Sequence, residues 1–381
     1  MTALERYNFP LFVESGAFDR LISARNKCFR KKILLVNLRD APLNAHMERA
    51  FVRAVAAANA SGKSVALDVL HYFANDYGFI GRADRTGFRV KYSGMSNLKD
   101  FAAKTKYDTL VMIDLPYGDE ELVPYAWLAL RDRTPEKFFI ANDILLPRGS
   151  IFGMDLAEDL QLLKKFSGAY ILNQHSERAW GRFGLPKGRV YERDLAVDCV
   201  YYDGRNVSSG DYAYSCGSSS RKFEDLLEAV RVAPPGLKLK IYTGLKPNLP
   251  ADLNGRVEFV PYTPDSSRMK HLIAGAKFVI LPIRPDKENP CAGLTVALMS
   301  MAMKKVVLTA GNPYMHRYLR DGINAFTYAK LSSETLVRGI KRILSLSRTQ
   351  RNSITDNARD TVLRLNNMDS FVSGFIKRHC G

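Results

Sequence analysis

Two basic side chains follow a small polar turn near the middle of the chain. The segment Tyr212–Ala229 (YAYSCGSSSRKFEDLLEA) predicts a strand that ends at Gly217, a turn of serines, and a helix that begins with Arg221 and Lys222. A guanidinium and an ammonium group beside a helix start can clamp a diphosphate, because both donate charge-assisted hydrogen bonds. We therefore expect Gly217, Ser218, Arg221 and Lys222 to contact a diphosphate. The alternative is that both basic side chains are only solvated.

A second polar loop leads into a helix further along the chain. The elements predicted there are a buried strand (Phe278–Pro282), a polar loop that ends in Asn289-Pro290-Cys291-Ala292-Gly293, an apolar helix (Leu294–Met303) and a buried strand (Val306–Thr309). Such a loop presents unpaired N–H groups and the positive end of the helix dipole, the simplest protein site for an anion. Gly293 would let the backbone approach a ligand closely. The alternative is an ordinary loop glycine.

Apolar runs that alternate with amphipathic stretches predict the elements that position these loops. The buried strands predicted besides those above are Ile33–Leu38, Val65–Phe73, Thr109–Ile113, Phe138–Ala141, Tyr170–Asn173, Leu239–Tyr242 and Val257–Val260. Strands alternating with helices predict parallel sheets covered on both faces, with right-handed crossovers. The linker-like segment Asp203–Gly210 falls where a second sheet begins, so we expect two α/β domains.

Polar side chains also follow strands of the first predicted sheet. In doubly wound sheets the loops at the carboxyl ends of strands line the ligand crevice. The candidates for substrate contact in such loops are Asn37, Arg39, Asp40, His46 and Asp143. Turn-forming polar residues belong in these loops whatever the function, which is the alternative explanation.

Composition narrows the class of protein. The 381 residues are 46% apolar, which is ample for two cores. No apolar run reaches the ~20 residues needed to cross a bilayer, and the N-terminus lacks a signal-like segment. These features predict a soluble or peripheral protein of the cytoplasm. The five cysteines are scattered and the six histidines isolated, so we expect neither a disulfide framework nor a bound metal.

The net charge of +17 is the strongest compositional signal. The excess is spread along the chain, which favours polyanionic partners in general: an anionic membrane surface, nucleotide diphosphates or nucleic acid. Charge alone does not choose among them. The basic segment Arg25–Lys32, beside the apolar side chains of Phe18–Phe29, is the candidate for membrane contact. The alternative is that this segment packs on the sheet.

The order of parts between Leu281 and Tyr328 resembles the donor half of GT-B glycosyltransferases, in particular the large retaining family 4. The family pattern is roughly E-x-x-G-L-[TP]-x-x-E-A-M-A-x-G-K-P-V-[VI]-x-[TS], followed by a glycine turn and a D-G-x-N-[GA] turn. Here Gly293-Leu294-Thr295 opens the helix and Asp321-Gly322 supplies the later turn. The resemblance implies an α/β fold: two Rossmann-like doubly wound domains that face a central cleft.

The resemblance also implies which substrate each domain binds. An acceptor-binding domain would span 1–200, a nucleotide-sugar-binding domain 201–365, and a C-terminal helix at 366–381 would return to the first domain. The segment from Gly217 resembles the element V-G-R-x-x-x-x-K-G-x-x-x-L-x-x-A, whose basic residues hold the donor diphosphate. Arg221 falls on the family lysine and Lys222 on its glycine.

Further donor contacts follow from the same resemblance. The loop amides of the family approach the donor sugar and phosphate, and the turn after the V-x-F-x-G strand reads the base. The donor sugar and nucleotide residues implied here are Tyr262, Glu288, Asn289, Gly293, Leu294 and Thr295. Pro261 replaces the family glycine, and Tyr262 would stack on the base; packing of this ring in the core is the alternative.

The chain departs from the family at its second glutamate, which binds the donor ribose. Aligned through Gly293 that position is Leu298, and with one inserted residue it is Met299. Neither supplies a carboxylate, and Glu288 is the nearest acidic residue that would compensate. The missing ribose contact leaves open a catalytically inactive GT-B-like protein that binds a nucleotide sugar or glycan.

The implied activity is transfer of a sugar from a nucleotide diphosphate donor to a hydroxyl of a glycan or lipid-linked acceptor, with retention of configuration. Asp143 or Asp40 would stabilise an oxocarbenium-like transition state or take the acceptor proton. No cofactor and no metal would be needed, because basic side chains and helix ends stabilise the leaving diphosphate. A glycosyltransferase acting on DNA is the alternative that the charge also allows.

Overall fold

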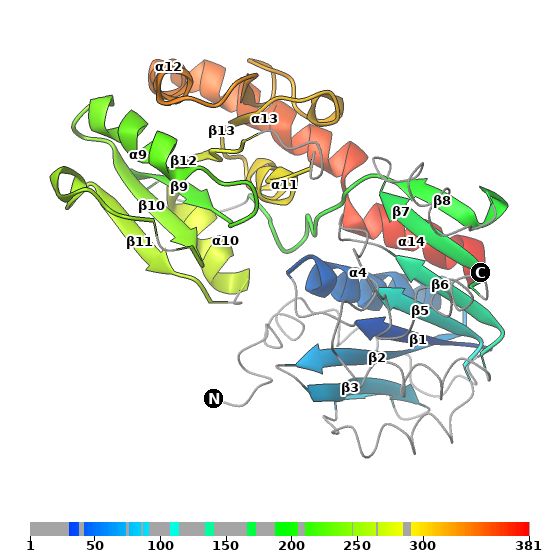
Figure 1. The fold of residues 1–381 in the computed structure, drawn as a ribbon. Coiled ribbons are helices and arrows are strands. Elements are labelled where there is room, and N and C mark those ends of the chain that lie inside the picture. Colours follow the sequence, from blue (N-terminus) through cyan, green and yellow to red (C-terminus); the bar gives the residue numbers. More distant parts are fainter. Residues whose placement is uncertain are drawn as a thin grey trace. The chain divides into compact units, whose positions relative to one another are not determined.

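The computed structural model describes residues 30–37, 42–73, 76–84, 87–90, 107–113, 134–140, 166–172, 187–204, 210–245, 247–263, 266–284 and 291–380. These residues form two compact α/β units (Figure 1). The chain passes from the first unit to the second at Leu195/Ala196 and returns after Asn367. The sequence prediction divides it at 200/201 and 365/366. Ala196 belongs with the second unit because the next residue, Val197, pairs with the backbone at Asn366 and Asn367.

Within the described residues, eight strands form the sheet of the first unit, in the order β4-β3-β2-β1-β5-β6-β7-β8. Their bounds are β1 (Lys31–Asn37), β2 (Val65–Phe73), β3 (Asp76–Asp84), β4 (Gly87–Val90), β5 (Thr109–Ile113), β6 (Glu136–Ile140), β7 (Gly168–Leu172) and β8 (Val190–Arg193). The strands from β2 to β8 in this order are parallel. The strand order reverses between β1 and β5, as in doubly wound sheets.

The antiparallel edge formed by β3 and β4 is a feature that the sequence pattern does not predict. Their sequences, DYGFIGRAD and GFRV, contain three glycines and four charged residues instead of a buried apolar run. β4 is the edge strand and needs ladder hydrogen bonds on one side only, and antiparallel strands near an edge do not require a continuous apolar run. The sheet is therefore mixed rather than wholly parallel.

Two helices pack together in the first unit, although they come from opposite ends of the chain. Helix α4 (Pro42–Ala60) and helix α14 (Met368–His379) lie side by side against the sheet (Figure 1). The ring of Phe375 meets Phe51 of α4 edge-on at 5.5 Å and Phe138 of β6 at 5.3 Å between centroids. Arg53 also donates two hydrogen bonds to the Asp369 carboxylate, at 2.7 and 3.1 Å. The last helix thus completes the core of the first unit.

The second unit contains a wholly parallel sheet in the order β11-β10-β9-β12-β13-β14. Its strands are β9 (Tyr212–Cys216), β10 (Lys238–Thr243), β11 (Val257–Pro261), β12 (Ala276–Ile280), β13 (Val307–Ala310) and β14 (Phe326–Tyr328). Its α-helices are α9 (Phe223–Val232), α10 (Ser266–Gly275), α11 (Leu294–Ala302), α12 (Ser333–Leu344) and α13 (Arg348–Leu365). If the six strands are numbered in chain order, their order in the sheet is 3-2-1-4-5-6, the Rossmann arrangement. The predicted strands are confirmed to within two residues, whereas β14 was not predicted.

Helix α11 ends in a backbone conformation that suits glycine, yet the residue there is Lys304. The Lys305 amide donates to Ser300 (2.9 Å) and the Lys304 amide to Met301 (3.0 Å), the pattern of a Schellman motif. Lys304 has φ = 55°, in the left-handed region.

We expect Lys304→Gly to raise the free energy of unfolding by about 1 kcal/mol over Lys304→Ala, because only glycine adopts this φ without strain. Both variants lose the ion pair between Lys304 and Asp356, so the comparison isolates the backbone effect. Urea denaturation of the two variants measures the difference. Equal stabilities would contradict the explanation.

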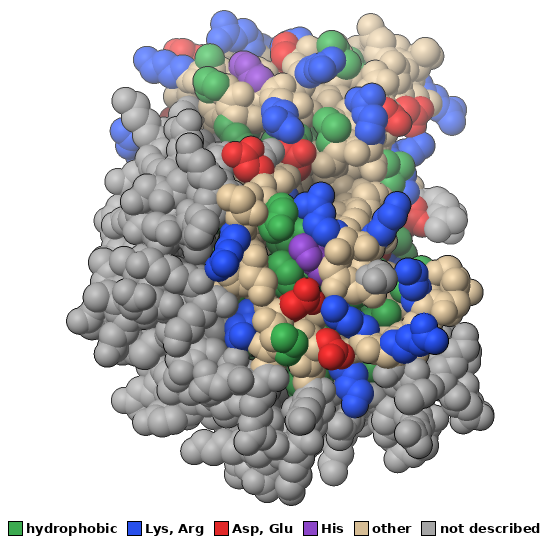
Figure 2. Space-filling view, turned by 90° about the vertical axis from the view of Figure 1, so that its right-hand side faces the viewer, with side chains coloured by type: hydrophobic (Ala, Val, Ile, Leu, Met, Phe, Trp, Pro, Cys, Tyr) green, Lys and Arg blue, Asp and Glu red, His purple; other side chains and the backbone are tan. Residues whose placement is uncertain are grey.

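The charge on one face of the described residues is dispersed. On the face that Figure 2 shows, Lys and Arg side chains lie apart from one another, with acidic and uncharged side chains between them. No helix among the described residues is both long and apolar enough to cross a membrane.

Candidate functional site

The strand order of the second unit reverses at β9, which pairs with β10 on one side and β12 on the other. Ligands of open α/β sheets bind outside the carboxyl ends of the strands at such a switch point. The turn after β9 is tied to the loop after β12 by an antiparallel β-bridge between Arg221 and Ile283. Its two hydrogen bonds run from the Lys222 amide to the Pro282 carbonyl (2.9 Å) and from the Arg284 amide to the Ser220 carbonyl (3.0 Å).

These contacts correct the prediction that a helix begins with Arg221 and Lys222. Helix α9 begins at Phe223, with Lys222 as its N-cap, so both basic residues precede the helix. The reason is the bridge to Ile283, which holds Arg221 in extended backbone at the end of the turn. The guanidinium therefore lies beside the ends of β9 and β12 and not on the first turn of α9.

The Arg221 guanidinium is held by its own turn. Its Nε donates to the Cys216 carbonyl at 2.8 Å, and its Nη1 to the Ser219 carbonyl at 2.9 Å. Its Nη2 makes no further hydrogen bond with any described residue. Burial lowers the pKa of this guanidinium from its usual value, but arginine stays charged in proteins. A preorganised cation with unused donors is what recognition of a phosphate group requires.

Two left-handed glycines flank this guanidinium. Gly217 has φ = 100° and Gly293 has φ = 79°. A Cβ atom built on Gly217 would lie 2.7 Å from Arg221 Nη2, and one on Gly293 would lie 3.3 Å from the same atom. The structure therefore brings together the two predicted loops, which lie more than seventy positions apart in the sequence. Glycine is required at both places by conformation and by space.

Gly293 is also the N-cap of helix α11, and no side chain caps this helix. The first-turn amides of a helix have no partners inside it. The Leu294 amide donates to the Cys291 carbonyl (2.9 Å), so the amides left for a ligand are those of Thr295 and Val296. Leu294 is buried, whereas Gly293 and Thr295 are half-buried. The side chains that follow point into the core: Leu298 and Met299 are 0% and 1% exposed. Neither apolar side chain is available to a ribose.

A tyrosine that the sequence analysis did not single out fixes the loop after β12. The hydroxyl of Tyr328, at the end of β14, accepts from the Ile283 amide and donates to the Leu281 carbonyl, both at 2.7 Å. Burial raises its pKa, so it stays protonated and can donate. Nothing in the local pattern around Tyr328 signals this role, because only the sheet order brings it to Ile283.

Three further predicted donor residues of the second unit, Ser218, Lys222 and Tyr262, follow the carboxyl ends of its strands. Ser218 and Lys222 are exposed. Tyr262 directly follows β11, is 50% exposed, and its ring lies 5.2 Å from that of Tyr242, tilted by 39°. Thr243, at the end of β10, donates to the Gly217 carbonyl at 2.9 Å. The ring of Tyr262 is thus on the surface and not in the core.

The predicted site residues of the first unit are either buried or lie outside the described part of the structure. Asn37 ends β1, is fully buried, and donates from Nδ2 to the Glu48 carboxylate at 2.9 Å. His46 is wrongly predicted as a loop residue: it lies inside α4 and is fully buried, because the helix begins at Pro42. The predicted residues that lie outside the described part of the structure are Arg39, Asp40, Asp143, Glu288 and Asn289. Among the described residues, no cluster of His, Cys, Asp and Glu could hold a metal ion.

Comparison with solved structures places this arrangement in a known fold. HepE from Anabaena, in complex with UDP and glucose, is similar over 92% of this chain and 99% of its own, with 13% identity and a TM-score of 0.58. A glycosyltransferase from Rickettsia africae matches over 92% and 98% (13% identity, TM-score 0.61). Sucrose-phosphate synthase from Thermosynechococcus elongatus matches over 92% and 99% (14% identity, TM-score 0.59).

These similarities show that the chain has the GT-B fold, with two Rossmann-like units. The similarity in fold extends over nearly the whole of each chain, although the sequences are only 13–14% identical. No protein-family model matches the sequence, and no curated protein matches it at a significant level.

Proposed function

We propose that the protein is a glycosyltransferase that moves a sugar from a nucleoside diphosphate donor to a hydroxyl of a glycan or lipid-linked acceptor, with retention of configuration. The observation that carries the proposal is the Arg221 guanidinium between Gly217 and Gly293, beside the uncapped start of α11. Support also comes from the fold, since HepE of the same fold binds UDP and glucose.

The chemistry of the site suits a leaving diphosphate. Cleavage of the bond between sugar and phosphate leaves negative charge on the diphosphate. Preorganised donors placed where that charge develops stabilise the transition state without reorganisation. Arg221 and the first-turn amides of α11 would do this, with the exposed ammonium of Lys222 nearby. On this proposal no cofactor is needed, and the carboxylate that assists the sugar transfer is Asp143 or Asp40.

The proposal also includes the acceptor and the location of the protein in the cell. The net charge of +17 suits an anionic membrane surface at the cytoplasmic face, where a lipid-linked acceptor would be met. Of the proposed basic segment, Arg25 and Lys27 lie outside the described residues, and the Lys31 ammonium pairs with Glu136 at 3.0 Å. Vesicle binding that requires anionic lipid and declines with salt would support this part.

One observation favours a second candidate, a GT-B protein that binds a nucleotide sugar or glycan without turnover. The family glutamate that would hold the ribose is replaced by Leu298 or Met299, and both are buried. In that case ribose is held by other groups or not at all. Transfer or hydrolysis of the donor separates the two candidates, because only an enzyme releases the nucleoside diphosphate.

The test of the proposed function is a thermal-shift screen of UDP, GDP and their sugars, followed by a donor-hydrolysis assay with the best ligand. A ligand present at 100 times its Kd stabilises the native state by about 2.7 kcal/mol, which is readily measured. We expect at least one nucleoside diphosphate to raise the melting temperature and its sugar to be hydrolysed or transferred. Binding without turnover would favour the second candidate, and no binding of any nucleotide would reject both.

A further inference from the structure

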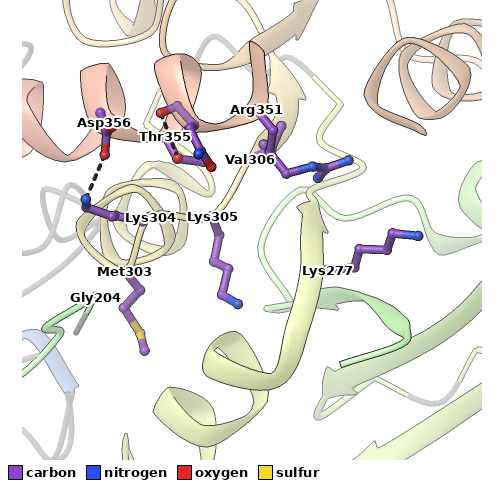
Figure 3. A pocket seen from close by; sticks show the side chains of 10 residues that line it. Gly204, Lys277, Met303, Lys304, Lys305, Val306, Arg351, Thr355 and Asp356 are labelled. Carbon is purple, nitrogen blue, oxygen red and sulfur yellow. Dashed lines mark hydrogen bonds and ion pairs between the residues drawn. The ribbon is translucent and has the colours of Figure 1, made fainter. Parts of the chain in front are cut away.

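A second hollow lies at the other end of the second unit's sheet (Figure 3). It has a volume of about 350 Å³, within the range of small-molecule sites. Lys277 lines it from the start of β12, and Lys305 and Val306 line it from just before β13. β12 and β13 are parallel, so their amino ends lie together here, whereas their carboxyl ends lie at the switch point. The hollow is therefore not part of the site around Arg221.

The side chains around this hollow are strongly basic. Four cations line it, namely Lys277, Lys304, Lys305 and Arg351, against the single carboxylate of Asp356. That carboxylate is paired with Lys304 at 2.7 Å, as the dashed line in Figure 3 marks. No described carboxylate pairs with the other three cations. This concentration of positive charge contrasts with the dispersed charge on the face that Figure 2 shows.

Two of these cations are shielded from water, and one of them, Arg351, has a buried donor without an acceptor among the described residues. Arg351 donates from Nη2 to the Ile343 carbonyl at 3.0 Å, but its Nη1 is buried and bonds to none of the described residues. Lys305 is 5% exposed, and its ammonium donates to the carbonyls of Ala274 (2.5 Å) and Ala276 (2.7 Å). Burial lowers the pKa of Arg351 and lowers that of Lys305 to about 8. Buried donors without acceptors destabilise a fold, and a bound anion would offset this cost.

We propose that this hollow binds a phosphate-bearing small molecule, with its phosphate group between Arg351 and Lys277, whose side chains extend to the same side in Figure 3. A guanidinium and an ammonium group can serve several oxygens of one phosphate at the same time. The hollow suits a small molecule and not a nucleic acid strand, because its cations line one space of about 350 Å³ and do not follow a stripe. Its place at the amino ends of the strands makes it a second anion site, separate from the donor site.

The test is a titration of the full chain with pyrophosphate in the presence of saturating UDP, followed by calorimetry. Arg351→Met is expected to raise the Kd for pyrophosphate at least tenfold, and Lys277→Ala several-fold.

Arg364→Ala is the matched control: it removes one exposed positive charge from the same helix, α13, outside the hollow. Neither Arg364→Ala nor Arg221→Ala is expected to change the Kd. Lys277 is exposed, so its variant is expected to fold even if Arg351→Met, which loses the bond to Ile343, does not.

Three results would overturn the inference: no binding of pyrophosphate by the parent, an equal loss of affinity in Arg364→Ala, or a loss in Arg221→Ala with none in Lys277→Ala. The last result would place the anion in the donor site. If no nucleoside diphosphate binds, the proposed function fails, yet the titration with pyrophosphate alone still tests the hollow. Vesicles containing phosphatidic acid show whether the phosphate group belongs to a lipid or to a soluble molecule. A loss of vesicle binding in Lys277→Ala indicates a lipid phosphate, and unchanged vesicle binding indicates a soluble one.

Discussion

Arg221→Ala is expected to weaken the binding of a nucleoside diphosphate by about 1.5–3 kcal/mol, the usual contribution of a charge-assisted hydrogen bond. The reason is the position of Nη2, which lies beside the start of α11 with no protein acceptor among the described residues. Arg221→Lys is expected to recover only part of the loss, because an ammonium lacks the planar fork of donors. Calorimetric titration with UDP or GDP measures both effects.

A structural role of Arg221 has to be separated from ligand binding. Its bonds to Cys216 and Ser219 hold the turn, so the alanine variant also loses stability. The melting temperature without ligand gives this loss, and titration well below it gives the affinity. Arg338→Ala, an exposed arginine on α12, is the charge-matched control and is expected to bind as the parent does. If folded Arg221→Ala binds the nucleotide unchanged, the diphosphate site lies elsewhere.

Gly293→Ala is expected to be the most damaging single change at the site. The left-handed φ of 79° costs an L-residue about 1–2 kcal/mol. In addition, the new Cβ would lie 2.2 Å from Cδ1 of Ile283, a buried side chain that has little room to move. We expect both lower stability and a loss of nucleotide binding, because relief of this contact displaces the start of α11 or the loop after β12.

The chain supplies a matched control for this prediction. Gly255 has nearly the same φ, 78°, but a Cβ built there meets nothing within 4 Å. Gly255→Ala therefore carries the backbone strain alone, and its loss of stability should be smaller. Ile283→Val removes the offending Cδ1 atom, so the double variant Ile283→Val/Gly293→Ala should recover part of the loss. No recovery in the double-mutant cycle would mean that crowding is not the cause.

The parts of the fold that could be predicted are those with a strong local pattern. Buried runs such as Thr109–Ile113 and Tyr212–Cys216 coincide with strands, because a strand covered on both faces is apolar throughout. The antiparallel strands β3 and β4 could not be predicted, since they lack such a run. The start of α9 was misplaced because the bridge between Arg221 and Ile283 is a contact between distant segments, which no local pattern records.

The residues of the candidate site were also predicted only in part. Gly217, Arg221 and Gly293 were identified from loop chemistry and from a family resemblance, and the strand order brings them together. Tyr328 was missed, because a buried tyrosine in a short strand looks like any core residue. His46 was misjudged, because the polar residues before it suggest a loop, whereas the helix already includes them. Sequence patterns thus locate loops well and long-range hydrogen bonds poorly.

The position of α14 has a consequence for the biosynthesis of the protein. The ribosome completes the eight described strands of the first unit before it starts the second, but Asp369 and Phe375 are added only after the second unit. Until then the partners of α14 on the first unit, among them Phe51 and Arg53, lack the helix that covers them. The first unit is therefore synthesised first but completes its fold last. While it lacks α14 the nascent chain is most prone to aggregate and to bind chaperones.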